Sequence, residues 1–129
     1  MTSINWTDWE PRFLAFLQEQ AAADAAHDQA HVARVVHNAR QIATLEGADQ
    51  AVVIPAAWLH DCVIVLKDSP LRAQASRLAA ETAVVFLRRA HYPSQYLEAI
   101  AHAIEAHSFS AGIPPQTIEA KVVQDADRL

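Results

Sequence analysis

The sequence of 129 residues is poor in cysteine, in glycine and in positive charge. Its single cysteine, Cys62, cannot form an internal disulfide, and apolar neighbours predict a packed thiol in a reducing cytoplasm. The net charge of -5 gives no basic footprint, so we expect neither direct nucleic-acid binding nor attachment to an anionic membrane. No signal peptide is apparent, and the most apolar window, residues 51–66, is shorter than the roughly 20 residues that span a bilayer.

Helix-forming patterns dominate what is present. Apolar residues recur three and four positions apart, and no segment alternates as a half-buried strand does. We expect a first helix opened by a capping box at Thr7–Glu10, and a last helix over 117–129. Between them we expect helices over 28–46, ended by Gly47, then 50–62, 69–90 with Ser69 as N-cap, and 94–107. The sequence therefore predicts an all-α protein, a single helical bundle over residues 1–129.

Two apolar stretches each carry acidic residues that a core helix normally avoids. "AWLHDCVI" contains His60 and Asp61, and "KVVQDADRL" contains Asp125 and Asp127. An ionised carboxylate buried without a partner costs several kcal/mol, so a hydrogen-bond network, a salt bridge or a metal ion must compensate it. Asp127 follows Val123 by one turn on the inward face, whereas Asp125 points away, so Asp127 is the better ligand.

Histidines spaced by one helical turn provide a second sign of a metal site. In "HDQAH", His27 and His31 share one face of a helix, and His31 lies on its inward side beside Val35. A zinc peptidase of the H-E-x-x-H type would need a glutamate where Asp28 stands, which disfavours that function.

A structural explanation without metal stays open for the histidine–aspartate pair. Asp61 would then pair with Arg34 or Lys67, and His60 would donate to a backbone carbonyl.

The remaining histidines are weaker candidates. His107 ends a predicted helix, where the negative end of the helix dipole favours an imidazolium. His37 and His91 fit surface or packing positions, and His102 has no role that the sequence resolves.

The ordered set His31, His60, Asp61 and Asp127 resembles the metal-binding pattern of the HD-domain phosphohydrolase superfamily, which is named after the adjacent pair. "HDQAHVARVVHNARQIA", "AAWLHD", "AIEAHSFSAG" and "EAKVVQDADRL" look like its small YedJ-like bacterial branch. The resemblance runs from His27 onward and implies a helical bundle of the HD-domain type with a central metal site. Those four residues would be the ligands. Chains of that branch usually continue with further helices after this point, so we expect residues 1–129 to form a single HD domain that lacks those C-terminal helices.

The resemblance implies a metal-dependent hydrolase of a small phosphate monoester, such as a nucleotide. Two imidazoles and two carboxylates suit one divalent ion, whether Mn, Fe, Co, Ni, Zn or Mg. Such an ion lowers the pKa of bound water and neutralises phosphoryl charge. Asp61 and His107 are the expected catalytic residues: Asp61 orients the attacking water, and His107 acts as an acid or contacts the phosphate.

Lys67, Arg72, Ser76 and His27 are the expected substrate-binding residues, although a solvated loop and helix face explains the first three equally well. A non-catalytic helical module that binds a metal or a phosphorylated ligand is the alternative function, and a closed coordination shell would favour it. Apolar surface left where the chain ends at Leu129 would favour a homo-oligomer.

Overall fold

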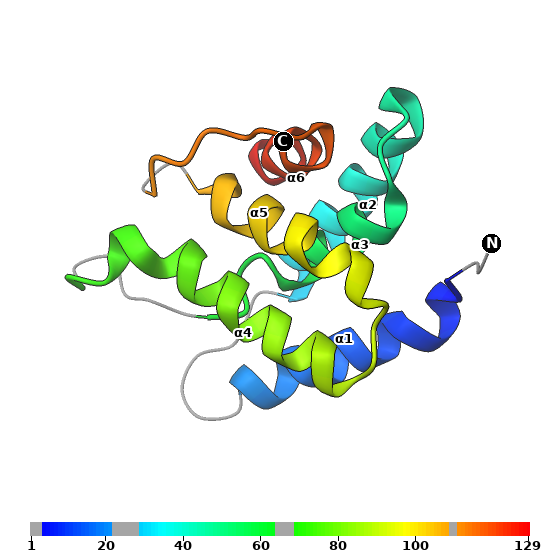
Figure 1. The fold of residues 1–129 in the computed structure, drawn as a ribbon, viewed down its shortest axis with the longest axis horizontal. Helices are drawn as coiled ribbons and strands as arrows, with labels where there is room; N and C mark the ends of the chain where they lie inside the picture. The colour runs from blue at the N-terminus through cyan, green and yellow to red at the C-terminus, as the bar shows by residue number, and fades with distance from the viewer. Residues whose placement is uncertain (1–3, 22–28, 64–68, 109–110) are drawn as a thin grey trace.

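The structure is a computed structural model that describes residues 4–21, 29–63, 69–108 and 111–129. All regular structure within these ranges is helical, which confirms the predicted all-α fold. The α-helices are α1 (Trp6–Ala21), α2 (Gln29–Glu46), α3 (Gln50–Leu59), α4 (Ala75–Arg89), α5 (Leu97–His107) and α6 (Ile118–Arg128) (Figure 1). Short 3-10 helices, Arg72–Gln74 and Ser94–Tyr96, precede α4 and α5.

Helix α3 forms the centre of the bundle. Its sequence, QAVVIPAAWL, is apolar around the whole helix, and eight of its ten residues are buried. A helix of this kind needs neighbours on every side, because each of its faces loses free energy in water. The other helices supply them, since α1, α2, α5 and α6 all pack against α3. The C-terminal end of α3 is thereby held in the interior.

A proline inside α3 creates a backbone defect that another element repairs. Pro55 has no N–H, so it cannot donate to the carbonyl of Ala51 one turn earlier. The hydroxyl of Tyr92, which follows α4, donates to this carbonyl at 2.5 Å. Tyr92 is itself 3% exposed, and burial raises the pKa of its hydroxyl, which keeps the donor proton in place. Tyr92 therefore ties the start of α5 to the central helix.

The start of α1 differs from the predicted capping box. The helix begins at Trp6, and the side chain of Asn5 accepts a hydrogen bond from the Thr7 amide at 3.0 Å. Glu10 binds Arg40 at 2.7 Å and the Trp58 indole N–H at 2.8 Å instead of reaching back to Thr7. Asparagine is as good an N-cap as any residue, and the guanidinium gives Glu10 a stronger, charge-assisted partner. The predicted capping box is therefore wrong.

Two helix ends also shift from their predicted positions. Helix α3 ends at Leu59 rather than at residue 62, so His60 is its C-cap and Asp61 lies in the following turn. Ser69 accepts from the amide of Leu71 at 3.1 Å and caps a turn, while α4 itself begins only at Ala75. Gly47 ends α2 with a φ of 71°, as predicted from its place after the last apolar residue.

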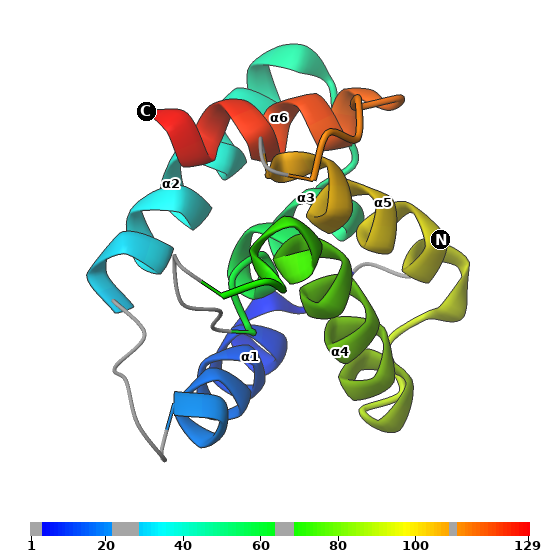
Figure 2. The same ribbon diagram turned by 90° about the vertical axis from the view of Figure 1, so that its left-hand side faces the viewer.

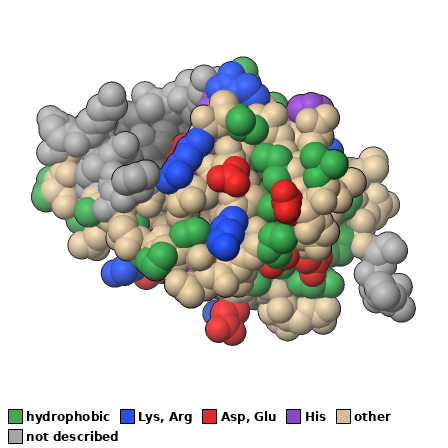
Figure 3. Space-filling model, turned by 90° about the horizontal axis from the view of Figure 1, so that it is seen from above, with side chains coloured by type: hydrophobic (Ala, Val, Ile, Leu, Met, Phe, Trp, Pro, Cys, Tyr) green, Lys and Arg blue, Asp and Glu red, His purple; other side chains and the backbone are tan. Residues whose placement is uncertain are grey.

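The surface carries charges of both signs. On the face seen from above, acidic and basic side chains are interspersed among apolar ones (Figure 3). None of the described helices combines the length and the apolar character needed to cross a bilayer.

Candidate metal centre

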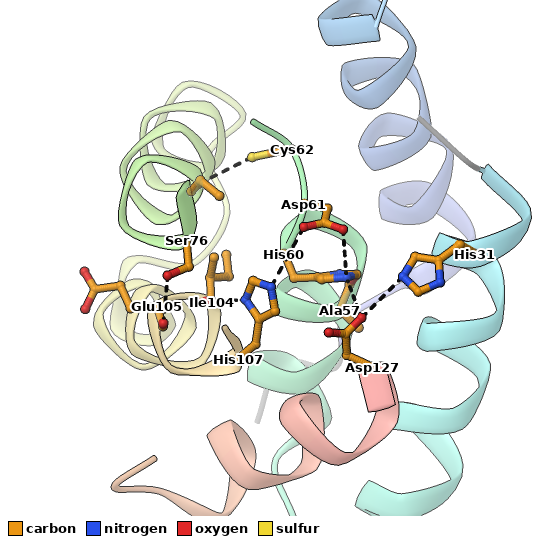
Figure 4. Close-up of polar contacts among 11 residues, drawn as sticks. His31, Ala57, His60, Asp61, Cys62, Ser76, Ile104, Glu105, His107 and Asp127 are labelled. Atoms are coloured by element: carbon orange, nitrogen blue, oxygen red, sulfur yellow. Dashed lines mark hydrogen bonds and ion pairs between the residues drawn. The ribbon is translucent and has the colours of Figure 1, made fainter. Parts of the chain in front are cut away.

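Four helix segments converge on one cluster of imidazoles and carboxylates (Figure 4). His31 comes from the first turns of α2, His60 and Asp61 from the end of α3, His107 from the last residue of α5, and Asp127 from the last turn of α6. Residues at helix ends can meet in this way, because their side chains extend beyond the parts of the helices that pack against one another. The structure thus brings together all four residues expected as ligands, and His107 with them.

His60 is the buried member of the cluster. Its side chain is fully buried, and Nδ1 lies 2.7 Å from the carbonyl oxygen of Ala57 in the preceding turn. A carbonyl only accepts, so Nδ1 carries the proton and donates, which leaves Nε2 with its lone pair in the neutral ring. Among the described residues, Nε2 has no hydrogen-bond partner. A buried nitrogen with a free lone pair costs energy unless a cation or a donor occupies the space in front of it.

Asp127 lies in front of two imidazoles at once. Its Oδ1 is 3.3 Å from Nε2 of His60 and 3.3 Å from Nε2 of His31. These contacts are longer than ordinary charge-assisted hydrogen bonds, which are about 2.7–2.9 Å. Three potential ligand atoms from α2, α3 and α6 therefore surround one point within 4.8 Å of one another.

Asp61 and His107 form the other side of the cluster. Asp61 Oδ2 is 3.6 Å from His60 Nε2, and Asp61 Oδ1 is 3.9 Å from His107 Nε2. Asp61 is 56% exposed, whereas His107 is nearly buried and donates from Nδ1 to the carbonyl of Ile104 at 2.5 Å. Asp61, which the sequence places in an apolar stretch, is therefore the residue of the cluster that reaches solvent.

The carboxylates and the burial set the protonation of the cluster. Burial alone would lower the pKa of His60, but Asp127 and Asp61 outweigh it and raise this pKa above its ordinary value. Burial would raise the pKa of Asp127, yet the imidazoles, above all His60, lower it to about 2. Burial lowers the pKa of His107, and the neighbouring His60 lowers it further. The two carboxylates thus favour the charged form of His60, and the imidazoles favour the charged form of Asp127.

These residues fit a divalent cation. Two groups of three ligands, His31–His60–Asp127 and His60–Asp61–His107, share His60. Since Nε2 of His60 has one lone pair, the two groups cannot both hold an ion through His60 at the same time. Mixed nitrogen and oxygen donors suit several divalent metals and do not select one of them.

Of the four predicted substrate-binding residues, the structure describes the side chain of Ser76 alone. Ser76 is 2% exposed, and its hydroxyl donates to the carbonyl of Glu105 at 2.9 Å, so this group links α4 to α5. Arg72 lies in the 3-10 helix before α4. His27 and Lys67 lie outside the described residues. His102, which the sequence left without a role, accepts from the amide of Gln116 at 2.9 Å and holds the segment before α6.

One basic side chain at the cluster escaped the sequence-based site prediction. Arg34 was considered only as a salt-bridge partner of Asp61, but its Nη2 lies 3.1 Å from Nδ1 of His31. The sequence could have indicated this contact, because Arg34 follows His31 by three residues, and residues three apart on a helix lie on neighbouring parts of its surface.

Comparisons with known proteins agree with the fold. The family model of the HD domain matches residues 29–129, from the start of α2 to the last residue. The uncharacterized protein YpgQ of Bacillus subtilis (strain 168) is 33% identical over 109 residues, which are 81% of this chain. The chain spans 51% of the length of YpgQ. The crystal structure of a predicted HD superfamily hydrolase from an uncultured Thermotogales bacterium matches with a TM-score of 0.69 and 29% identity, over 97% of this chain and 73% of that one.

Proposed function

The chain belongs to the HD-domain family, and from this premise we propose that it is a metal-dependent phosphohydrolase that cleaves phosphate monoesters, with nucleotides as the first substrates to test. We propose His31, His60, Asp61 and Asp127 as the ligands of one divalent ion. Asp61 and His107 are the proposed catalytic residues. The similarity to a predicted HD superfamily hydrolase supports hydrolysis as the reaction class.

The observation that carries this proposal is the environment of His60 Nε2. This atom is buried, lacks a hydrogen-bond partner among the described residues, and faces carboxylate oxygens at 3.3 and 3.6 Å. A lone pair surrounded by negative oxygens is repulsive, so a cation has to lie between them. A divalent ion at this position would meet this need for both carboxylates at once.

The residues around the ion differ in what they offer the reaction. A bound divalent ion would supply Lewis-acid stabilisation of the phosphoryl oxygens and a lower pKa for the attacking water. Asp61 is suited to orient that water, because its carboxylate is both exposed and beside the ligands. His107 Nε2 lies 3.9 Å from Asp61 Oδ1, too far for a hydrogen bond, so both atoms keep the capacity to bind water or substrate.

The lowered pKa of His107 favours one of its two expected roles. Burial and the nearby His60 keep the ring neutral at pH 7, and its one proton is donated from Nδ1 to Ile104. Nε2 then accepts hydrogen bonds and has no proton to give. We therefore propose that His107 accepts a hydrogen bond from water or from a protonated substrate oxygen, rather than acting as an acid.

We propose Arg34 as a basic side chain that contacts the substrate phosphate. Its guanidinium is exposed, borders His31 and carries a positive charge. We expect Arg34→Met to raise KM for a phosphate ester more than it lowers kcat. An unchanged KM would remove Arg34 from the proposed phosphate site.

Metal content followed by turnover tests the proposal. Asp127→Asn keeps the shape of the side chain and removes its charge, while Asp125→Asn makes the same change at an exposed position two residues earlier on α6. We expect the wild type and Asp125→Asn to bind about one ion of Mn, Co, Ni or Zn by elemental analysis. Asp127→Asn should lose at least about 100-fold in affinity, since even outer-shell changes cost 10–100-fold.

Hydrolysis of p-nitrophenyl phosphate and of nucleoside monophosphates is then measured on the same three proteins. Turnover that follows metal content supports the phosphohydrolase. Stoichiometric metal without any turnover would refute the enzyme and favour the non-catalytic binding module. Equal metal binding by Asp127→Asn and Asp125→Asn would refute the site itself.

A further inference from the structure

A groove separates α1 from α4 on a part of the surface that the proposed reaction does not use. In Figure 1, α1 runs from right to left and α4 from left to right, and the two helices spread apart in the view of Figure 2. The groove has a volume of about 740 Å³. Among the described residues, its walls come from these two helices: Arg12, Ala15, Phe16, Glu19 and Gln20 from α1, and Glu81, Thr82, Val85, Phe86 and Arg89 from α4.

The middle of the groove is apolar. Phe16 and Phe86 stack across it with their ring centroids 4.2 Å apart and their planes 17° from parallel. Val85 stands beside them and is 48% exposed, which makes it one of the few large apolar side chains left in solvent. Apolar side chains grouped in a groove with a charged rim are typical of interaction surfaces.

The two ends of the groove carry opposite charges. Arg12 donates to the carbonyl of Ala90 at 3.0 Å, which places the N-terminal half of α1 beside the C-terminal end of α4. Arg12 and Arg89 therefore lie at one end, and Glu19 and Glu81 lie at the other. Seven or eight residues of helix separate the ends, about 10–12 Å at 1.5 Å per residue. Each end thus has one charge from each helix.

Most of these charges have no intramolecular partner. Within the part of the chain that the structure describes, Glu19, Glu81 and Arg89 are exposed and form no ion pair. Arg12 makes only its bond to Ala90 and a stacking contact with Trp9, its guanidinium carbon 4.1 Å from the ring centre. The charges are thus available to a partner that presents the opposite pattern.

We propose that this groove is the interface of a homodimer in which α1 and α4 pack against the same two helices of a second copy. The two-fold axis of this dimer lies in the interface and crosses the groove at the level of Phe16 and Phe86. Rotation about it reverses the direction of the groove, so the basic end of one copy meets the acidic end of the other. The same rotation brings both Val85 side chains to the centre. The surface is therefore complementary to itself in charge as well as in apolar character, and this singles out a second copy as the occupant.

Charge reversal on α4 provides the test. Arg89→Glu leaves two acidic positions on α4, and Glu81→Arg leaves two basic ones. In either variant a two-fold pair would bring like charges together, so dimer dissociation constants should rise at least about tenfold over the wild type. An equimolar mixture of the two variants should form a heterodimer, because each then meets opposite charges at both ends. Lys121→Glu on α6 is the matched control with the same loss of charge outside the groove.

Sedimentation velocity and light scattering over a concentration series measure the mass, and circular dichroism verifies that each variant is folded. We expect a concentration-dependent dimer for the wild type and for Lys121→Glu, weaker dimers for the single variants, and recovery in the mixture. A wild type that stays monomeric, single variants that dimerise like the wild type, or a mixture that does not recover would each overturn the proposal. None of these outcomes depends on metal binding or turnover, so the test is independent of the proposed function.

Discussion

The hydrogen bond from Tyr92 to the central helix predicts that removing the Tyr92 hydroxyl oxygen lowers the free energy of unfolding by a large amount. Tyr92→Phe removes the hydroxyl that donates to Ala51 at 2.5 Å and leaves the ring in its buried place. Because Pro55 has no N–H to offer, the Ala51 carbonyl then stays buried without a donor. The lost hydrogen bond and the unsatisfied carbonyl together should cost about 2 kcal/mol of unfolding free energy. For a domain of this size that is roughly 6–10 °C in Tm.

Urea denaturation of the metal-free protein measures this cost, and Tyr96→Phe is the matched control. Tyr96 is half-buried four residues away, and its hydroxyl has no partner within the described residues, so its loss should change stability by less than about 0.5 kcal/mol. Pro55→Ala adds a decisive second arm, because an N–H at position 55 can again bond the Ala51 carbonyl. Pro55→Ala should therefore be more favourable by about 1 kcal/mol in the Tyr92→Phe background than in the wild type.

Two results would refute this reasoning. Equal effects of Tyr92→Phe and Tyr96→Phe would mean that the Ala51 carbonyl does not need the hydroxyl. Additive effects of Pro55→Ala and Tyr92→Phe would mean that the two groups do not share one acceptor.

Three further predictions concern single groups. Cys62 is buried and donates to the carbonyl of Ala79, and burial raises the pKa of its thiol to about 12. Iodoacetamide at pH 8 should therefore label Cys62 only when the protein unfolds. Rapid labelling of the folded protein, measured by mass spectrometry, would contradict this. His91 has a φ of 65°, so His91→Gly should raise the unfolding free energy by about 0.5–1 kcal/mol in a thermal melt, whereas a loss would show that the imidazole itself contributes. The pKa of Asp127 falls from 3.8 to about 2 on folding, so metal-free protein should lose this contribution as the pH falls from about 4 to 2. In acid titrations followed by urea melts, Asp127→Asn should lack that part of the pH dependence, and identical profiles would disprove it.

The helices could be predicted because local patterns determine them. Apolar spacing of three and four residues predicted α2, α5 and α6 close to their observed bounds, and Gly47 marked the end of α2. The errors lie at helix ends, where several groups compete for the same backbone donors. At α1, Asn5 caps the helix, and Glu10 is drawn to Arg40, which lies 30 residues further along the chain.

Only part of the cluster at the centre of the bundle could be predicted from the sequence. The order of His31, His60, Asp61 and Asp127 pointed to a metal site through family resemblance, since spacing alone cannot show that the start of α2 and the ends of α3 and α6 meet at one place. The close approach of His107 to His60, with ring centroids 4.9 Å apart, depends on the packing of α5 against α3. Ser76 shows the opposite case: it lies on a helix face that looked solvated in the sequence, and the packing of α4 against α5 buries it.

The buried polar group that lacks a partner in the structure is not the one that the sequence indicated. Asp61 seemed to need compensation in an apolar helix, but the helix ends at Leu59 and Asp61 reaches solvent. The buried group without a partner is instead Nε2 of His60. A cation at this atom would also be shared by His31 and Asp127, and so would connect α2, α3 and α6. Binding would then stabilise the fold by an amount that grows with the logarithm of the metal concentration, because the unfolded chain does not keep these ligands together.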